Sequence, residues 1–291
     1  MAIITISREL ATLGDETARE LAKQLGYNLV DKNTLSERIK SYGVEDSKLV
    51  KYDERKPSFI ASLSHDRDDY LHYLRTAILA EAERANCVFI GRGAGAIFKN
   101  MPAWISVFLA APLEIRIERV KSYFHCDENR ARQIIEHSDQ DRIGFHRYFF
   151  DVEWRNPGNY HISLNTGISH PALCAEIVML LKNRIFTPEA EEQNKIRLKE
   201  LILEQKIKHN IAYEQGIPVH FLEVSAAGVF AAGNGAAESG VTLYGVVNSQ
   251  SLCDSAANAA LKAAQEITGG AENPVTIRNE IQIVHEYTVM P

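Results

Sequence analysis

Several features that mark particular protein classes are missing from this chain of 291 residues. Its four cysteines, Cys87, Cys126, Cys174 and Cys253, lie far apart and form no Cys-x-x-Cys pair, so neither a disulfide framework nor a zinc site is predicted. No apolar run reaches the roughly 18 residues that a membrane-spanning helix needs. The net charge of −6 also lacks the basic excess that favours binding to a nucleic-acid backbone, and nucleic acid is not an expected partner.

The overall composition is that of a globular protein, with 45% hydrophobic and 24% charged residues. The length predicts two domains or one large domain. The first apolar segment begins at residue 3, which leaves no room for a signal peptide, so a cytoplasmic location is expected.

The opening segment predicts a strand, a turn and a helix in that order. Ile3-Ile4-Thr5-Ile6 is a β-branched run typical of a buried strand, and apolar residues recur at helical spacing from Ala18 onward. This layout is that of a phosphate-binding loop, where backbone N–H groups and a helix N-terminus hold an anion. The pattern G-x-x-x-x-G-K-[ST] is not present, however. Aligned on Gly14, Glu9 stands at the first glycine and Asp15 at the lysine.

Two interpretations of this loop remain open. One is an ordinary strand-to-helix turn, which Asp15 favours, because a carboxylate about 4 Å from a phosphate charge costs roughly 4 kcal/mol at an effective dielectric near 20. The other is a phosphate site, where Arg8, Arg19 or a bound magnesium ion would offset that cost.

Strands and helices alternate up to about residue 184. Strands are predicted at 27–31, 87–90, 104–110 and 160–166, and helices at 33–42, 69–85, from 114, at 127–150 and at 170–184. The stretch 44–70 is highly charged, with a breaker at 53–57. Alternation of this kind predicts an α/β domain, residues 1–186, with a parallel sheet and helices on both of its faces.

The pattern changes at 187–192, which predicts a second domain over residues 187–291. Helices are predicted at 190–213 and 250–267, and strands at 218–224, 240–248 and 275–285. The Ala- and Gly-rich stretch 225–240 predicts a long mobile hairpin loop. These elements predict a small α+β domain with helices on one face of a three-stranded sheet.

Arginine side chains are the main candidates for binding chemistry. Gly91-Arg92-Gly93 follows a buried strand, where open α/β sheets place ligands, and Arg92 can hold a phosphate with two N–H groups. The alternative is a surface arginine in a flexible turn. Arg116, Arg119, Arg142 and Arg147 predict a cationic lid, whereas solvated helix charges or ion pairs account better for at least two of them. His137 and His146 have no metal-binding spacing, so no metal site is predicted.

At these residues, positions 1–184 resemble the cytidylate kinase-like family, a branch of the P-loop nucleoside monophosphate kinases. The resemblance is carried by Ile6-Ser7-Arg8-Glu9 with Gly14, Leu21-Ala22-Lys23-Gln24-Leu25-Gly26-Tyr27, Phe89-Ile90-Gly91-Arg92-Gly93-Ala94, the segment 107–116, Ser138-Asp139-Gln140-Asp141-Arg142 and the segment 160–166. The family implies ATP, magnesium and transfer of the γ-phosphoryl group to a nucleoside monophosphate such as CMP. By resemblance, Ser7, Arg8, Thr12, Gly14 and Thr17 would bind the donor nucleotide. Arg92 would hold the acceptor, and Arg116, Arg142 and Arg147 would form a catalytic lid.

The loop departs from the family pattern, and two functions therefore remain open. The family has a Gly-Ser-Gly-Gly run followed by a basic residue, whereas this chain has Ala11-Thr12-Leu13-Gly14 followed by Asp15. The first function is an ATP-dependent phosphotransferase acting on nucleoside monophosphates. The second is a catalytically inactive protein that binds a nucleotide or serves as a scaffold.

Residues 190–287 resemble a BON domain, a module of membrane-surface, phospholipid or protein contacts. The resemblance is carried by Gly240-Val241-Thr242-Leu243-Tyr244-Gly245-Val246-Val247 and by the segment 275–283. It implies an attachment or regulatory domain without catalytic residues. The segment lacks the cluster of lysine and arginine that an anionic lipid surface needs. A protein partner, or a second copy paired through a strand edge, is therefore expected rather than a membrane.

Overall fold

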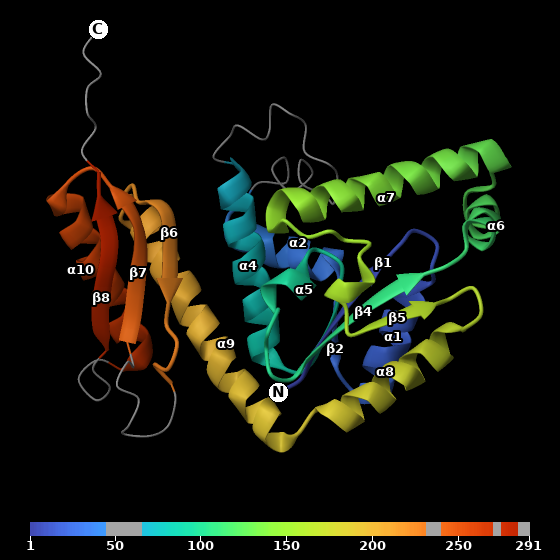
Figure 1. Cartoon of the computed structure of the whole chain (residues 1–291), viewed down its shortest axis with the longest axis horizontal. Helices are drawn as coiled ribbons and strands as arrows, with labels where there is room; N and C mark the ends of the chain where they lie inside the picture. The colour runs from blue at the N-terminus through green and yellow to red at the C-terminus, as the bar shows by residue number, and fades with distance from the viewer. Residues whose placement is uncertain (45–65, 231–239, 270–274, 285–291) are drawn as a thin grey trace, which may run out of the picture. The chain divides into compact units, whose positions relative to one another are not determined.

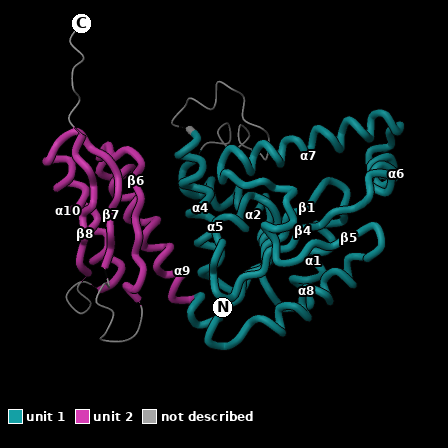
Figure 2. Tube along the Cα trace, in the orientation of Figure 1, with its two compact units in different colours: residues 1–194 teal, residues 195–291 magenta. Residues whose placement is uncertain are grey.

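The computed structural model describes residues 1–44, 66–230, 240–269 and 275–284. The chain divides into two compact units, Met1–Asn194 and Lys195–Pro291 (Figure 2). The boundary lies inside helix α9 (Pro188–His209), not before it. The reason is Asn194, whose fully buried amide accepts from the Ala103 N–H at 2.9 Å and donates to the Ala103 C=O at 2.8 Å. The first turns of α9 therefore pack with the first unit.

The first unit contains a parallel sheet of five strands in the order β2-β3-β1-β4-β5. The strands are β1 (Ile3–Arg8), β2 (Asn28–Val30), β3 (Cys87–Ile90), β4 (Trp104–Ala110) and β5 (Ile162–Asn165). Because β1 lies in the centre, the loop that follows it opens at the middle of the sheet's carboxyl edge. The predicted α/β fold class is confirmed.

Helices lie on both faces of this sheet (Figure 1). They are α1 (Gly14–Leu25), α2 (Lys32–Lys40), α4 (Asp66–Arg84), α5 (Ala94–Ile97), α6 (Leu113–Phe124), α7 (Glu128–Phe150) and α8 (Pro171–Ile185), with a short 3₁₀ turn η2 (Pro157–Asn159). Helices α1 and α8 pack together on one face, where Leu21 and Val178 join the inward side chains of the strands. On the other face Phe89 contacts Phe98 after α5. Most of the charged stretch 44–70 lies outside the described residues.

Side chains cap the starts of α2 and α7, whereas α1 has no side-chain cap. Asp31 accepts the Thr34 N–H at 2.9 Å to start α2, and Asp127 accepts the Arg130 N–H at 2.8 Å to start α7. The residue before α1 is Leu13, which has a left-handed backbone and provides no side-chain cap. The N–H groups of the first turn of α1 are therefore left for other partners.

The second unit is a mixed sheet of three strands covered by helices. Strands β6 (His220–Ser225) and β7 (Gly240–Val247) are antiparallel, and β8 (Thr276–Ile283) lies parallel to β7. The later part of α9, with Leu203 and Ile207, and helix α10 (Gln250–Thr268) form one core with these strands. The predicted α+β architecture is confirmed.

Two further expectations for the second unit stay predictions. Residues 231–239 of the expected hairpin loop lie outside the described residues. The interaction role expected from the resemblance to a BON domain stays a prediction. Within the described residues, no helix is both long and apolar enough to cross a membrane.

Candidate functional site

The loop between β1 and α1 has an uncommon backbone for its sequence. Ala11 has a φ of 60° and Leu13 a φ of 54°, both in the left-handed region. This region costs a residue other than glycine roughly 1–2 kcal/mol. These two positions correspond to glycines in the Gly-Ser-Gly-Gly run of the family pattern. The loop is therefore left-handed at two positions where the family pattern has glycine.

Two arginines of α6 hold this backbone in place by its carbonyl groups. The Arg116 Nε donates to the Leu10 C=O at 2.8 Å. The Arg119 guanidinium donates to the Ala11 C=O at 3.0 Å and to the Thr166 C=O at 2.7 Å. Strained backbone persists only where surrounding contacts over-determine it, and these contacts supply that restraint.

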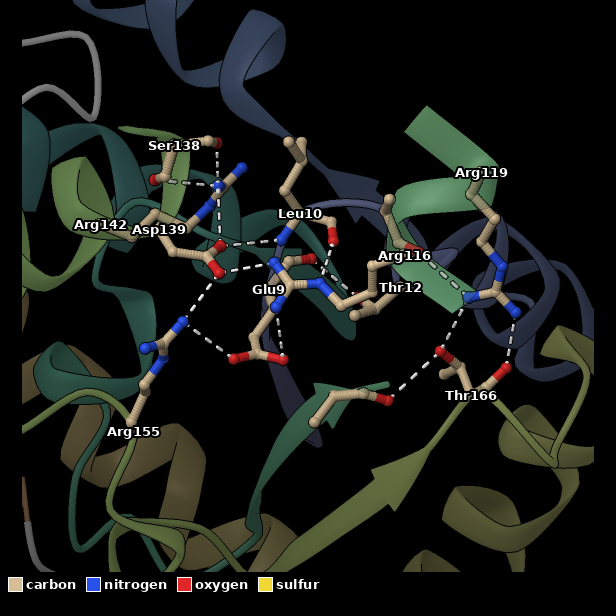
Figure 3. A network of polar contacts seen from close by, with 12 residues as sticks. Glu9, Leu10, Thr12, Arg116, Arg119, Ser138, Asp139, Arg142, Arg155 and Thr166 are labelled. Atoms are coloured by element: carbon tan, nitrogen blue, oxygen red, sulfur yellow. Dashed lines mark hydrogen bonds and ion pairs between the residues drawn. The ribbon is translucent and has the colours of Figure 1, made fainter. Parts of the chain in front are cut away.

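Glu9 and Asp139 bind the other nitrogens of Arg116 (Figure 3). The Nη1 lies 3.2 Å from the Glu9 carboxylate, and the Nη2 donates to the Asp139 carboxylate at 2.5 Å. Asp139 also accepts the Leu10 N–H at 3.1 Å. Arg155 bridges the two carboxylates, at 3.1 Å from Glu9 and 2.8 Å from Asp139. Every nitrogen of Arg116 thus has a partner within the protein.

A cavity of about 1090 Å³ opens beside this network. Its walls are the loop, the start of α1, one side of α6 and part of α7: Arg8, Glu9, Leu10, Ala11, Thr12, Leu13, Gly14, Asp15, Glu16, Arg19, Glu114, Ile115, Glu118, Arg119, Val120, Ser122, Tyr123, Phe124 and Arg142. Backbone N–H groups of residues 11–16 have no acceptor in the described parts of the chain. A cavity of this size can take a nucleotide.

The side chains of the loop do not fit magnesium triphosphate. Asp15 stands at the lysine position and lies 3.5 Å from Arg8 in an ion pair. The hydroxyl of Thr17 is buried and donates to the Leu13 C=O at 2.8 Å, so it is turned toward the protein. Among the described residues that line the cavity there is no lysine, and four arginines stand beside five carboxylates. Across the described ranges, no cluster of three His, Cys, Asp or Glu side chains can hold a metal ion.

Comparison with known proteins places this geometry in a family. The model of the cytidylate kinase-like family matches residues 3–168, which is more than half of the chain. The chain belongs to the cytidylate kinase-like family. The matched segment contains the loop, the arginine network and the cavity. A search of curated proteins finds no match to this cytidylate kinase-like chain.

Solved structures resemble the first unit. An uncharacterized protein from Eubacterium ventriosum is 22% identical, with a TM-score of 0.50, and the match covers 63% of this chain and 99% of that one. Shikimate kinases from Aquifex aeolicus and Bacteroides thetaiotaomicron are 15% and 14% identical, with TM-scores of 0.33 and 0.39. Each match covers 62% of this chain, and 97% and 98% of the kinases. At such identities the similarity concerns the fold alone.

Most of the predicted donor residues of this cytidylate kinase-like protein lie together. Arg8, Thr12 and Gly14 line the large cavity, and Thr17 lies behind them in the first turn of α1. Ser7 instead lines a second cavity of about 290 Å³ together with Tyr160. Burial there raises the pKa of Tyr160 to about 12, although a hydrogen bond with Ser7 acts in the opposite direction.

The predicted catalytic arginines divide into two groups. Arg116 and Arg142 both contact Asp139, Arg116 through a hydrogen bond and Arg142 at 3.9 Å, and Arg142 also lines the large cavity. Arg92 is buried elsewhere, donates to the Tyr70 hydroxyl at 3.0 Å, and lines neither of the two cavities. Arg147 lies exposed on α7 and lines neither cavity.

Three residues with roles in this site were not found from the sequence. Arg155 joins the network from the segment after α7, and Glu9 and Asp139 act as its carboxylate partners. Arg155 has no periodic or motif context that would set it apart from a surface arginine. Asp139 lies in the mixed-charge run at residues 138–142, which was the one available signal.

Substitution of Gly93 by alanine tests the packing next to Arg92. Gly93 has a φ of 69°, and a Cβ there would lie 2.0 Å from the Phe150 ring. We expect Gly93→Ala to lower the free energy of unfolding by about 2–4 kcal/mol, from backbone strain and overpacking together. Gly26→Ala is the matched control, because Gly26 has a φ of 66° with open space around it. Equal losses in chemical denaturation would show that packing against Phe150 contributes nothing.

Proposed function

We propose that this cytidylate kinase-like protein binds a nucleotide without transferring a phosphoryl group. The observation that carries the proposal is the combination found at the loop. Residues 11–16 line a cavity large enough for a nucleotide, which supports binding. Arg116 is already bonded to Glu9 and Asp139, which removes a cation that transfer would need.

Negative charge at the transferring phosphate has to be neutralised for transfer to occur. Enzymatic phosphoryl transfer depends almost entirely on positioning and on neutralising charge, and one transition-state arginine is worth about 10³–10⁵ in rate. The family's basic residue is replaced here by Asp15. At about 4 Å and an effective dielectric near 20, this carboxylate repels a phosphate charge by roughly 4 kcal/mol, where a lysine would attract it by as much.

A turnover assay combined with calorimetry tests the proposal. Purified full-length protein is incubated with ATP, magnesium and CMP, UMP, AMP or GMP, and diphosphate products are separated by chromatography. We expect no diphosphate above the protein-free background, because the cations for transfer are replaced or bound. Calorimetry on the same sample should detect binding of a nucleotide or of its nucleoside part.

Two controls make the assay decisive. An active nucleoside monophosphate kinase in the same buffer shows that product would be detected. Diphosphate formed by this chain and lost in the Arg116→Ala variant would contradict the proposal. It would favour the phosphotransferase function that the family resemblance implies. Product that persists in that variant and rises with the concentration of this chain would also contradict the proposal, by a transfer that does not use Arg116.

A further inference from the structure

One wall of the large cavity is aromatic. Tyr123 and Phe124 are the last two residues of α6, and both line the cavity. Their side chains are 80% and 51% exposed, and their rings meet edge to face with centroids 5.0 Å apart. Aromatic rings gain most of their energy from burial, so exposed rings in a cavity wall indicate a surface that a ligand covers.

The charges around the same cavity disfavour a phosphate chain. Asp15 and Glu16 at the start of α1 and Glu114 on α6 add negative charge to its lining. Of the four arginines in the lining, Arg119 is bonded to backbone carbonyl groups, Arg8 is paired with Asp15 and Arg142 donates to the Ser138 C=O. A ligand with three phosphates would bring further negative charge to a lining where carboxylates outnumber arginines.

We infer that the cavity recognises its ligand through the base and sugar, as a nucleoside whose base stacks on Tyr123 or Phe124. The phosphate chain adds no affinity. This inference rests on the proposed nucleotide binding and names the part of the ligand that is recognised. Leu10, Leu13 and Ile115 provide apolar lining in the same cavity, which suits a flat, uncharged ring.

Calorimetry of the full chain tests the inference with adenosine, cytidine, guanosine and uridine and with their triphosphates. We expect at least one nucleoside to bind with a Kd within about threefold of that of its triphosphate. Raising NaCl from about 0.05 to 0.5 M should change the nucleoside Kd less than about twofold, because salt screens charge interactions and not stacking.

Aromatic substitutions locate the binding at this cavity. Tyr123→Ala and Phe124→Ala are expected to weaken nucleoside binding, by about tenfold for the ring that carries the base. Both side chains are exposed, so neither change should disturb the fold. Phe221→Ala is the matched control, because Phe221 is 87% exposed in the second unit and lines neither of the two cavities. The Phe221→Ala variant should bind the nucleoside with the same affinity as the unchanged chain.

Several outcomes would overturn the inference. These are a triphosphate that binds at least about tenfold more tightly than its nucleoside, loss of binding in high salt, absence of nucleoside binding, and no effect of either aromatic substitution. Phosphate-dominated binding without diphosphate formation would leave the proposed function in place. Diphosphate formation that requires Arg116 would instead overturn the proposed function, and the aromatic variants would still decide the base site.

Discussion

Replacing Asp139 with alanine is expected to lower the free energy of unfolding of the first unit by about 3–5 kcal/mol, the usual result of breaking a buried ion pair. Asp139 is 2% exposed and binds Arg116, Arg155 and the Leu10 N–H. Within the described residues, its loss leaves the buried Arg116 guanidinium with Glu9 as its one carboxylate partner. Urea unfolding followed by tryptophan fluorescence is a suitable measurement, because both tryptophans, Trp104 and Trp154, belong to this unit.

A surface pair on the same helix is the control for Asp139. Glu128 and Arg132 are 2.7 Å apart on α7, and the Glu128 side chain is 55% exposed. Glu128→Ala should cost less than about 1 kcal/mol, as exposed pairs do. Asp139→Asn keeps an acceptor oxygen. Its loss in free energy of unfolding should therefore lie between those of Glu128→Ala and Asp139→Ala. If Asp139→Ala and Glu128→Ala have the same small effect, the network does not stabilise the fold.

Restoring the family's loop chemistry should raise the affinity for magnesium-ATP at least about a hundredfold, or about 2.8 kcal/mol. The variant combines Ala11→Gly, Thr12→Ser, Leu13→Gly and Asp15→Lys. The lysine reverses the sign of the charge beside the first turn of α1, where Asp15 now lies. The two glycines occupy positions that are already left-handed, so they should release strain without changing the backbone. Calorimetry measures the effect.

The control for the loop variant separates local from overall charge. Glu176→Lys on α8 makes the same change in net charge at an exposed site that does not line the cavity. It should leave the ATP affinity within about twofold of the original value, because screening removes distant charge effects. Affinity for adenosine should be the same in all three proteins. A loop variant with no gain for ATP would show that the four side chains are not what weakens phosphate binding.

The fold could be predicted from the sequence because its signals are local. Trp104-Ile105-Ser106-Val107-Phe108-Leu109-Ala110 is a continuous apolar run, and the structure places β4 at these residues. Helix α7 was expected over 127–150 and extends from Glu128 to Phe150. Such patterns follow from burial and helical spacing within a single segment. The boundary between the two units inside α9 was harder to predict, because Asn194 is bonded to Ala103, a residue far away in the sequence.

The site was harder to predict because its contacts join distant segments. The sequence left a lid role and an ion pair open for Arg116, and it could not name the pair with Glu9 and Asp139, because no spacing rule relates these positions. The left-handed backbone at Leu13 has a similar origin, since leucine does not favour that conformation and tertiary contacts impose it. Sequence could therefore indicate which residue types gather at the loop, but not how their charges pair.

Helix α9 bears on how the two units can be exchanged or separated in evolution. Its residues up to Asn194 bond to the first unit, whereas Leu203 and Ile207 lie in the core of the second. A recombination junction at residue 187, where the composition changes, would remove Asn194 and leave the buried Ala103 N–H without its acceptor. A viable junction has to fall after Asn194 and inside a continuous helix. Any replacement for the second unit would then have to begin with a helix in the same register.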